Sequence, residues 1–399
     1  MSLNEVVDRN RLELSPEPTE HELLERARSL LPVIRRHAER SEQDRRVVPE
    51  IVAEMRSLGL FRVLQPRRWG GYEMAPKVFT DIQIALGEAD MSVGWIYGVL
   101  GCHNFQMGLF DDRAAREVWG NDSSVLIASS SYQPAGKAEP VPGGYRFTGR
   151  WKFSSGVEHC DWVFLSGMHD GDFLTCLLPR ADYEIVDTWD VMGLKATGSQ
   201  DIHVNDVFLP EYRIHRSSEG FLCRGPGSAV NTGWLYRIPF HQIFLRAISS
   251  SAIGALEAMV GHFEVYGRER IGLAGVPSKL DPDAQYALGN ARRVIHELKA
   301  VAYANFAALT EYAVRAEVPP VEERLLYRLE CASVSERCLE AARLLFEACG
   351  GRGVFRSQPF GRIYNDLVAA NQHVAQQSRP VGRSLGATML GIDTKEWYL

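Results

Sequence analysis

The hydrophobic residues of this chain follow a helical period up to about residue 120. Apolar side chains recur three or four positions apart over 21–40, 49–59, 76–88, 92–109 and 112–119, a spacing typical of amphipathic helices. Thr19 is a candidate N-cap for the first helix, while Pro49 and Gly59 stand where the second would begin and end. The pattern predicts a helical N-terminal segment.

A different pattern begins near Ser124. From there to about residue 210, short runs rich in β-branched and aromatic residues alternate with turn sequences such as Pro142-Gly143-Gly144. No helical stretch separates these runs, so they predict strands of an antiparallel sandwich or barrel. Residues 211–233 have the composition of a loop or linker.

The helical period then returns and continues towards the end of the chain. Long patterns cover 243–266, 282–316, 321–349 and 358–390, and four such helices with short breaks predict a four-helix bundle. The order indicates an α+β fold with three units. We expect an N-terminal α-helical domain over 1–122, a central β domain over 123–235 and a C-terminal four-helix bundle over 236–399.

Composition narrows the class of protein. The formal net charge of −6 offers no basic excess to neutralise phosphates, so we expect no nucleic-acid partner. The first twenty residues mix charges without the apolar stretch of a signal peptide, and we find no apolar run long enough to span a bilayer. The seven cysteines are scattered without C-x₂-C spacing, which favours reduced thiols. These features predict a cytoplasmic protein without a membrane partner.

Common catalytic motifs are missing from the sequence. It contains no G-x-G-x-x-G after a strand, no Walker A sequence, no H-E-x-x-H and no G-x-S-x-G. The histidines are dispersed, without metal-ligand spacing, so we expect no metal site. Any chemistry must come from a bound cofactor or from residues that the fold brings together.

Several short segments, taken in order, carry a family resemblance. They are Leu64–Gly71, Gly94-Trp95, His103-Asn104, Ser129–Pro134, Phe153–His159, Gly193–Ser199, Asp206–Pro210 and Asn371–His373. Their order and spacing resemble enzymes with the acyl-CoA dehydrogenase fold. The similarity is greatest to the flavin-dependent monooxygenases (group D) of that fold, such as the oxygenase components of 4-hydroxyphenylacetate and 3-HSA hydroxylases.

The resemblance implies a specific activity. Such a chain would be the oxygenase component of a two-component monooxygenase and would receive reduced FMN or reduced FAD from a separate NAD(P)H:flavin reductase. With O₂ as co-substrate, a flavin C4a-hydroperoxide would hydroxylate a small aromatic substrate, here a phenol. The same resemblance implies a homotetramer.

The resemblance also assigns a strand end to the flavin ring. Ser130, Ser131 and Tyr132 match a segment that contacts the pyrimidine side of the flavin. Judged from the residues alone, a Ser-rich strand end that hydrogen-bonds to itself is the simpler interpretation.

A second flavin segment is Phe153-Ser154-Ser155. In the resembled enzymes a serine hydroxyl here lies beside flavin N5. Adjacent residues of a strand face opposite sides, so only one of the two serines can do so. Analogy with the threonine of the dehydrogenases favours Ser154, and Ser155 is the alternative. A turn before Gly156 would explain the same residues without a ligand.

Two histidines are the candidates for the substrate. His373 matches a histidine that contacts the substrate hydroxyl in phenol-hydroxylating relatives, and an imidazole with a pKa near 6.5 can accept a phenol proton. Its neighbour Val374 would touch the flavin. Trp95 and His103 match the wall of the flavin and substrate cavity. Each of these residues could instead be an ordinary packing residue.

The remaining candidates would bind the far end of the flavin. Arg268 matches a region that supplies an arginine to the flavin phosphate, with Arg270 as the weaker alternative. Gly351 and Arg352 lie in a turn that matches a flavin contact. A solvated helix end and a helix C-cap are the structural alternatives.

Three other functions are compatible with parts of the pattern. An N-, S- or indole oxygenase of the same branch would share the flavin residues. An FAD-dependent acyl-CoA dehydrogenase would need a catalytic carboxylate, and the matching stretch at 372–375 has none. A non-catalytic bundle protein would bind no reduced flavin.

Overall fold

The computed structural model describes residues 17–130, 135–221, 223–271, 275, 277–394, 396 and 399. Its first part is helical, with α1 (Glu20–Gln43), α2 (Pro49–Ser57), α3 (Pro76–Ala89), α4 (Met91–Met107) and α5 (Asp112–Trp119). Thr19 and Glu22 form a capping box that fixes the start of α1. The predicted N-terminal helices are confirmed to within a few residues.

Helix α4 differs from the other N-terminal helices because it has no exposed face. Every residue from Met91 to Met107 is buried. A helix that is apolar all round must lie inside the protein. Asp90 begins it by accepting hydrogen bonds from the backbone N–H groups of Ser92 and Val93. The helix that carries Trp95 and His103 is therefore at the centre of the molecule.

The central part is a sheet that contains eight strands. They are β1 (Ile127–Ser130), β2 (Gly136–Val141), β3 (Gly144–Ser154), β4 (Trp162–His169), β5 (Asp172–Pro179), β6 (Glu184–Val186), β7 (Gln200–Pro210) and β8 (Ile214–Arg216). The strand order is β6-β7-β3-β2-β4-β5-β8, and β1 pairs with β4.

The strand pattern predicted an antiparallel sheet, but the observed sheet is mixed. β1 and β2 both pair with β4 in the parallel direction, at 162–165 and 167–168 respectively. The two strands therefore follow one another along the same edge of β4. Alternation of side chains does not encode strand direction, so the sequence pattern could not show this. The region 211–233, predicted as a linker, also contains β8 and the short helix α6 (Ser217–Phe221).

The last part is the helical bundle, which consists of α7 (Phe240–Glu269), α8 (Pro282–Val314), α9 (Val321–Ala332), α10 (Val334–Cys349), α11 (Phe360–Asn371) and α12 (Ser378–Met389). The third predicted helix is interrupted at Ser333. The fourth is interrupted after Asn371, where His373 caps the 3₁₀ turn Val374–Gln376. This break places His373 at a bend between two helices.

Helix α7 corrects one sequence prediction. By length and composition it could span a bilayer, although we predicted that no such run exists. In the structure 89% of its most apolar window is buried inside the protein, as expected for the core helix of a bundle.

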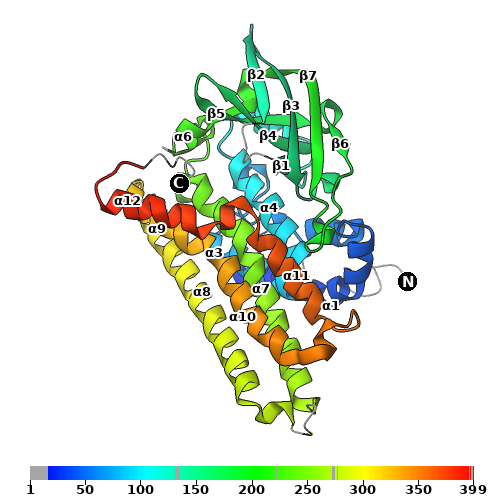
Figure 1. The fold of residues 1–399 in the computed structure, drawn as a ribbon. Helices are drawn as coiled ribbons and strands as arrows, with labels where there is room; N and C mark the ends of the chain where they lie inside the picture. Colours follow the sequence, from blue (N-terminus) through cyan, green and yellow to red (C-terminus); the bar gives the residue numbers. More distant parts are fainter. Residues whose placement is uncertain are drawn as a thin grey trace.

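The three parts share one hydrophobic core, with the sheet above the bundle and the N-terminal helices at its side (Figure 1). The largest buried cluster contains Leu23 from α1, Val163 from β4 and Leu256 from α7. A side chain near their common boundary can therefore contact all three parts.

Candidate active site

The candidate site lies where α4, the end of β3 and the bend after α11 meet. The indole Nε1 of Trp95 donates a hydrogen bond of 3.2 Å to Ser155 Oγ. The indole ring also packs edge-on against the imidazole of His373, with ring centroids 5.5 Å apart. The structure thus brings together three predicted site residues that are far apart in the sequence.

Ser154 and Ser155 have different surroundings. Ser154 pairs with Gln200 of β7 and is completely buried, and its hydroxyl has no hydrogen-bond partner among the described residues. Ser155 follows a register shift in the β3–β7 pairing, and Phe153, two residues before it, has a left-handed φ of 64°. This irregular backbone turns Ser155 out of the sheet towards α4.

The Ser155 hydroxyl belongs to a chain of hydroxyl groups. Ser155 Oγ lies 2.7 Å from Ser199 Oγ, which lies 2.7 Å from Thr197 Oγ1. Thr197 Oγ1 donates to the carbonyl oxygen of Leu194 at 2.9 Å. The segment Gly193–Ser199 contributed to the family resemblance, but no pattern in the sequence assigned Thr197 or Ser199 a role.

The loop that carries these hydroxyl groups is held by α11. Asp366 Oδ1 accepts a 2.6 Å hydrogen bond from the backbone N–H of Leu194. A Cβ on Gly193 would lie only 2.1 Å from the carbonyl oxygen of Asn365, so glycine is required for this close approach. Burial, followed by the nearby Asp90 carboxylate, raises the pKa of Asp366 to about 8.

The tautomer of His373 follows from its role as a cap. Its Nδ1 accepts the backbone N–H of Ala375 at 3.1 Å, so the neutral ring carries its proton on Nε2. Desolvation lowers the pKa of His373 to about 4, which keeps the ring neutral near pH 7. In this geometry the proton of the neutral ring lies on Nε2.

His103 has the opposite arrangement on α4. Its Nδ1 lies 2.9 Å from Gln106 Oε1, an acceptor, so the neutral ring carries its proton on Nδ1 and a lone pair on Nε2. That Nε2 is buried without a partner among the described residues, and Phe164, Phe240 and Phe244 surround the ring. Burial lowers the pKa of His103 to about 4.

Apolar side chains beside Ser155 are unusually exposed. Phe153 is 65% exposed and Val374 is 45% exposed. The Phe153 ring meets Trp189 edge-on, with centroids 6.1 Å apart. An exposed apolar surface beside a row of hydroxyl groups suits a flat heterocycle with apolar faces and a polar edge, as a flavin ring has. The residues present fit this cofactor.

The other predicted strand-end residues are only partly described. Ser130 Oγ donates a 2.5 Å hydrogen bond to the carbonyl oxygen of Lys152, which ties the end of β1 to β3 next to Phe153. Ser131 and Tyr132 lie outside the described residues.

The predicted phosphate residues lie at the opposite end of the bundle. One amide group of Gln83 donates to the carbonyl oxygens of both Gly94 and Ala247, so these two positions lie side by side. Arg268 is 21 residues further along α7, which corresponds to about 30 Å. One chain therefore does not bring Arg268 to Trp95.

The surroundings of Arg268 form a second region, the bundle tip, defined here as 265–271 and 350–355. Arg268, Gly351 and Arg352 are exposed. Arg270 donates to the carbonyl oxygen of Ala348 and stacks near Tyr266. Of the two arginines, Arg268 has the more accessible guanidinium group.

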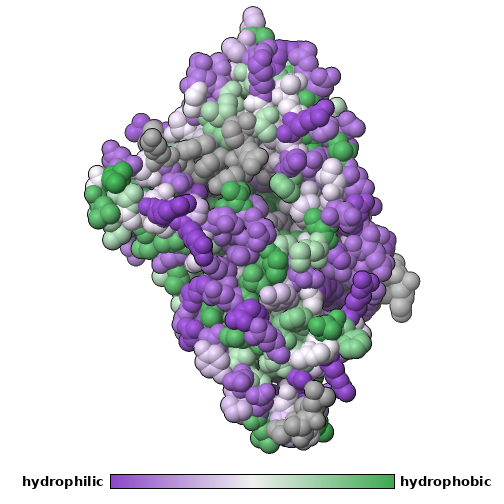
Figure 2. Space-filling view, viewed as in Figure 1, coloured by the Kyte–Doolittle hydropathy of each residue, from purple (hydrophilic) through white to green (hydrophobic). Residues whose placement is uncertain are grey.

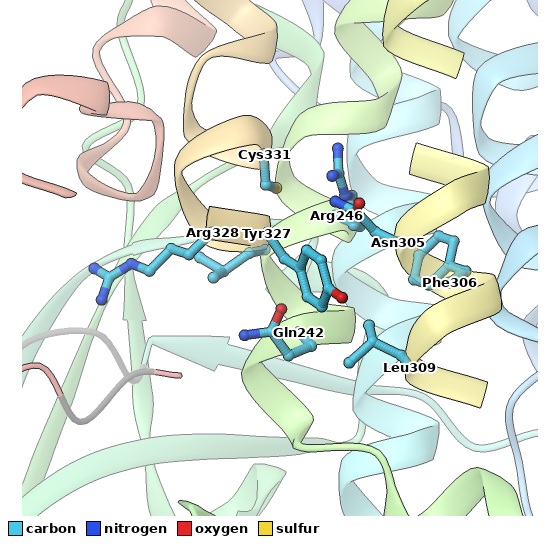
Figure 3. Close-up of a pocket in the computed structure, with 9 residues that line it drawn as sticks. Gln242, Arg246, Asn305, Phe306, Leu309, Tyr327, Arg328 and Cys331 are labelled. Carbon is cyan, nitrogen blue, oxygen red and sulfur yellow. The ribbon is translucent and has the colours of Figure 1, made fainter. Parts of the chain in front are cut away.

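Two cavities lie outside the candidate site. One is a narrow space between α7, α8 and α9 that is too small to hold a water molecule. Figure 3 shows Arg246 and Asn305 close together in it, with Arg328 extending away. The other is an open cleft of about 680 Å³, lined partly by Arg26, Arg56 and Arg62. Neither contains a predicted site residue.

Comparisons with known proteins show the family of the chain. The family model described as acyl-CoA dehydrogenase, C-terminal domain, matches residues 246–378. A flavin-dependent monooxygenase oxygenase subunit, HsaA, of Rhodococcus jostii (strain RHA1) is 35% identical over 359 residues, which are 88% of this chain and 94% of the relative. A pigment production hydroxylase of Rhodococcus erythropolis is 32% identical over 387 residues, 94% of this chain and 97% of the relative.

The solved structures lead to the same conclusion. The crystal structure of 3-HSA hydroxylase from Rhodococcus sp. RHA1 superposes with a TM-score of 0.91 at 33% identity, covering 95% of this chain and 99% of that one. The predicted fold class and family are confirmed. The chain belongs to the oxygenase components of the two-component flavin-dependent monooxygenases, which share the acyl-CoA dehydrogenase fold.

Proposed function

We propose that this chain hydroxylates a phenolic substrate with reduced FMN or reduced FAD bound beside Ser155. The observation that carries the proposal is the contact of Trp95 with both Ser155 and His373. It places a hydroxyl group suited to the polar edge of a flavin next to an imidazole suited to a substrate.

The exposed side chains suggest how the cofactor would be held. Phe153 and Val374 would contact the apolar faces of the flavin ring, while Ser130, Ser155 and the undescribed Ser131 and Tyr132 would face its polar edge. Reduced flavin supplies the electrons that activate O₂. Burial of Trp95 and Ser154 around the site would limit the access of water to it.

The two histidines would divide the work on the phenol. His103 presents a buried Nε2 lone pair and can accept the phenol proton. The Nε2–H of His373, beside Trp95, would orient the substrate by donating to one of its oxygen atoms. The Nε2 of His373 already carries the proton of the neutral ring, so this nitrogen cannot accept the phenol proton. We therefore propose His103 as the base and His373 as the orienting donor.

Substitution of the histidines tests the proposal. His103→Ala and His373→Ala should each lower product formation by about 10²–10⁴-fold. Both variants should still consume O₂, which is then reduced to H₂O₂ without hydroxylation. His296→Ala, an exposed histidine on α8, is the matched control. Hydroxylated product and H₂O₂ are measured in the same reaction with several phenols. Unchanged coupling in both variants would contradict a phenol substrate and favour an N-, S- or indole oxygenase.

The other partners are part of the same proposal. A separate NAD(P)H:flavin reductase would supply the reduced flavin in the cytoplasm, and we propose no nucleic-acid or membrane partner. The domain limits 1–122, 123–235 and 236–399 remain a proposal, supported by helices that end at Trp119 and a bundle that begins at Phe240.

A homotetramer would explain why apolar side chains are exposed at the bundle tip. Val265, Ile271, Val354 and Phe355 are each more than half exposed. Figure 2 shows hydrophobic residues on the face of the bundle that it displays. Exposed apolar side chains in such numbers are typical of an interface. In an assembly Arg268, Gly351 and Arg352 could reach the flavin of a neighbouring copy.

A further inference from the structure

The hydroxyl chain at Ser155 has a direction that follows from counting protons. A carbonyl oxygen can only accept, so the Thr197 hydroxyl proton is directed to Leu194. Thr197 Oγ1 can then only accept from Ser199, which uses the single proton of Ser199. Ser199 Oγ must therefore accept from Ser155. Each hydroxyl proton in the chain points away from Trp95 and towards Leu194.

This direction determines what Ser155 can offer to a ligand. Its proton is directed to Ser199, and one lone pair accepts the Nε1–H of Trp95. A hydroxyl oxygen has two lone pairs, so the remaining group is an acceptor. Ser155 thus presents a lone pair, and not a proton, on the side that is left to a ligand.

We propose that Thr197 and Ser199 are positioning residues that fix Ser155 as a hydrogen-bond acceptor, which makes the site selective for reduced flavin. This inference rests on the proposed binding of flavin beside Ser155. Reduced flavin carries an N5–H, which can donate to the lone pair of Ser155. Oxidised flavin has only a lone pair at N5, so two acceptors would face one another.

The fold holds the chain of hydroxyl groups in place from both ends. The Thr197 carbonyl oxygen accepts the backbone N–H of Gly156 at 2.8 Å, which joins the loop to the turn after Ser155. Asp366 of α11 holds the backbone of Leu194 at the other end. Ser199 and Thr197 are 3% and 1% exposed, so water has little access to compete for their protons.

Anaerobic titrations with FMN and FAD, each in the reduced and the oxidised state, test the inference. In the native protein the reduced form should bind at least about tenfold more tightly, the equivalent of one hydrogen bond. Thr197→Val lets Ser199 direct its proton to Ser155, and Ser199→Ala removes the acceptor of that proton. In both variants the Ser155 proton is released towards N5.

The expected result for both variants is a fall of about tenfold in the ratio of oxidised to reduced dissociation constants, which corresponds to about 30 mV in the potential of the bound flavin. Thr197→Ser keeps the hydroxyl and should retain the native ratio. Thr310→Val is the matched control, because Thr310 donates in the same way to the carbonyl oxygen of Phe306 in α8.

Other outcomes separate the inference from the function on which it rests. If both affinities fall together and the ratio stays constant, the two residues have a structural role only and the inference is wrong, while the proposed function stands. If the native protein binds no reduced flavin, both are overturned. Ser199→Ala decides the question should Thr197→Val fail to fold.

Discussion

The predicted flavin site has two parts: the junction, where Trp95, Ser155 and His373 meet, and the bundle tip around Arg268. The two parts differ in how many of their residues a single chain brings together. At the junction, Trp95, Ser155 and Ser199 are buried or partly buried and joined by hydrogen bonds. At the tip, Arg268 and Gly351 are exposed, and Arg268 lies about 30 Å from the junction by the length of α7.

The difference indicates which part of the site is preorganised. Side chains held by buried hydrogen bonds lose little freedom when a ligand binds, whereas exposed arginines must be ordered at that moment. The junction would thus set the selectivity for the flavin ring within one chain. The tip would add affinity only in an assembly, where another copy provides the ring. Predictions that treat the two regions differently can test this comparison.

The largest expected effect is a change in the pH dependence of stability with Asp366→Asn at the junction. The folded pKa of Asp366 is about 8, above the ordinary value near 3.8, because the carboxyl is buried and lies near the Asp90 and Glu42 carboxylates, which outweigh the opposing effect of Arg362. The folded state therefore holds the proton that the unfolded state has lost, and stability should fall by up to several kcal/mol as pH rises from about 4 to about 8.

An asparagine side chain in place of the native aspartate would keep an oxygen for the Leu194 N–H but has no proton to lose. We expect Asp366→Asn to flatten the dependence of the urea midpoint on pH between 4 and 8. Part of the slope should remain, because burial also raises the pKa of Asp90 and Glu42. An equal slope in both proteins would show that Asp366 is charged in the folded state.

A pair of glycine substitutions compares the two regions directly. Gly193→Ala at the junction would place its Cβ 2.1 Å from the carbonyl oxygen of Asn365, so we expect a loss of about 1–3 kcal/mol in the free energy of unfolding. At the tip nothing lies within 4 Å of the corresponding Cβ of Gly351, and Gly351→Ala should change stability by about 0.5 kcal/mol or less. Chemical denaturation measures both. Similar losses would remove the proposed distinction.

Mixed assemblies test whether the tip serves another copy. Ser155→Ala and Arg268→Ala should each weaken binding of reduced flavin by about tenfold, the value of one hydrogen bond to a charged or polar group. If each flavin lies between two copies, co-assembled variants regain about a quarter of the native sites. Arg270→Ala should have the smaller effect, because Arg270 already bonds to Ala348. No recovery in the mixture would place both residues in one chain's site.

The sequence allowed the helices and the site segments to be predicted, but not their connections. The start of α1 and both ends of α2 were predictable because Thr19, Pro49 and Gly59 act locally. The parallel pairing of β1 with β4 and the bend at His373 depend on tertiary packing. So does the choice between the two serines, since a register shift and the left-handed Phe153 decide which one leaves the sheet.

The site residues that were not predicted from the sequence were missed for one physical reason. Thr197, Ser199 and Asp366 have no unusual spacing, and serine or threonine in a glycine-containing loop is commonly a turn residue. Their role becomes visible only when the loop is placed between α11 and β3.

The most direct test of the central claim is a crystal structure with reduced FMN bound under anaerobic conditions. We predict flavin N5 at about 3 Å from Ser155 Oγ, with the ring against Phe153 and Val374 and the phosphate near Arg268 of another copy. A flavin bound elsewhere, for instance in the cleft at Arg26, Arg56 and Arg62, would contradict the account.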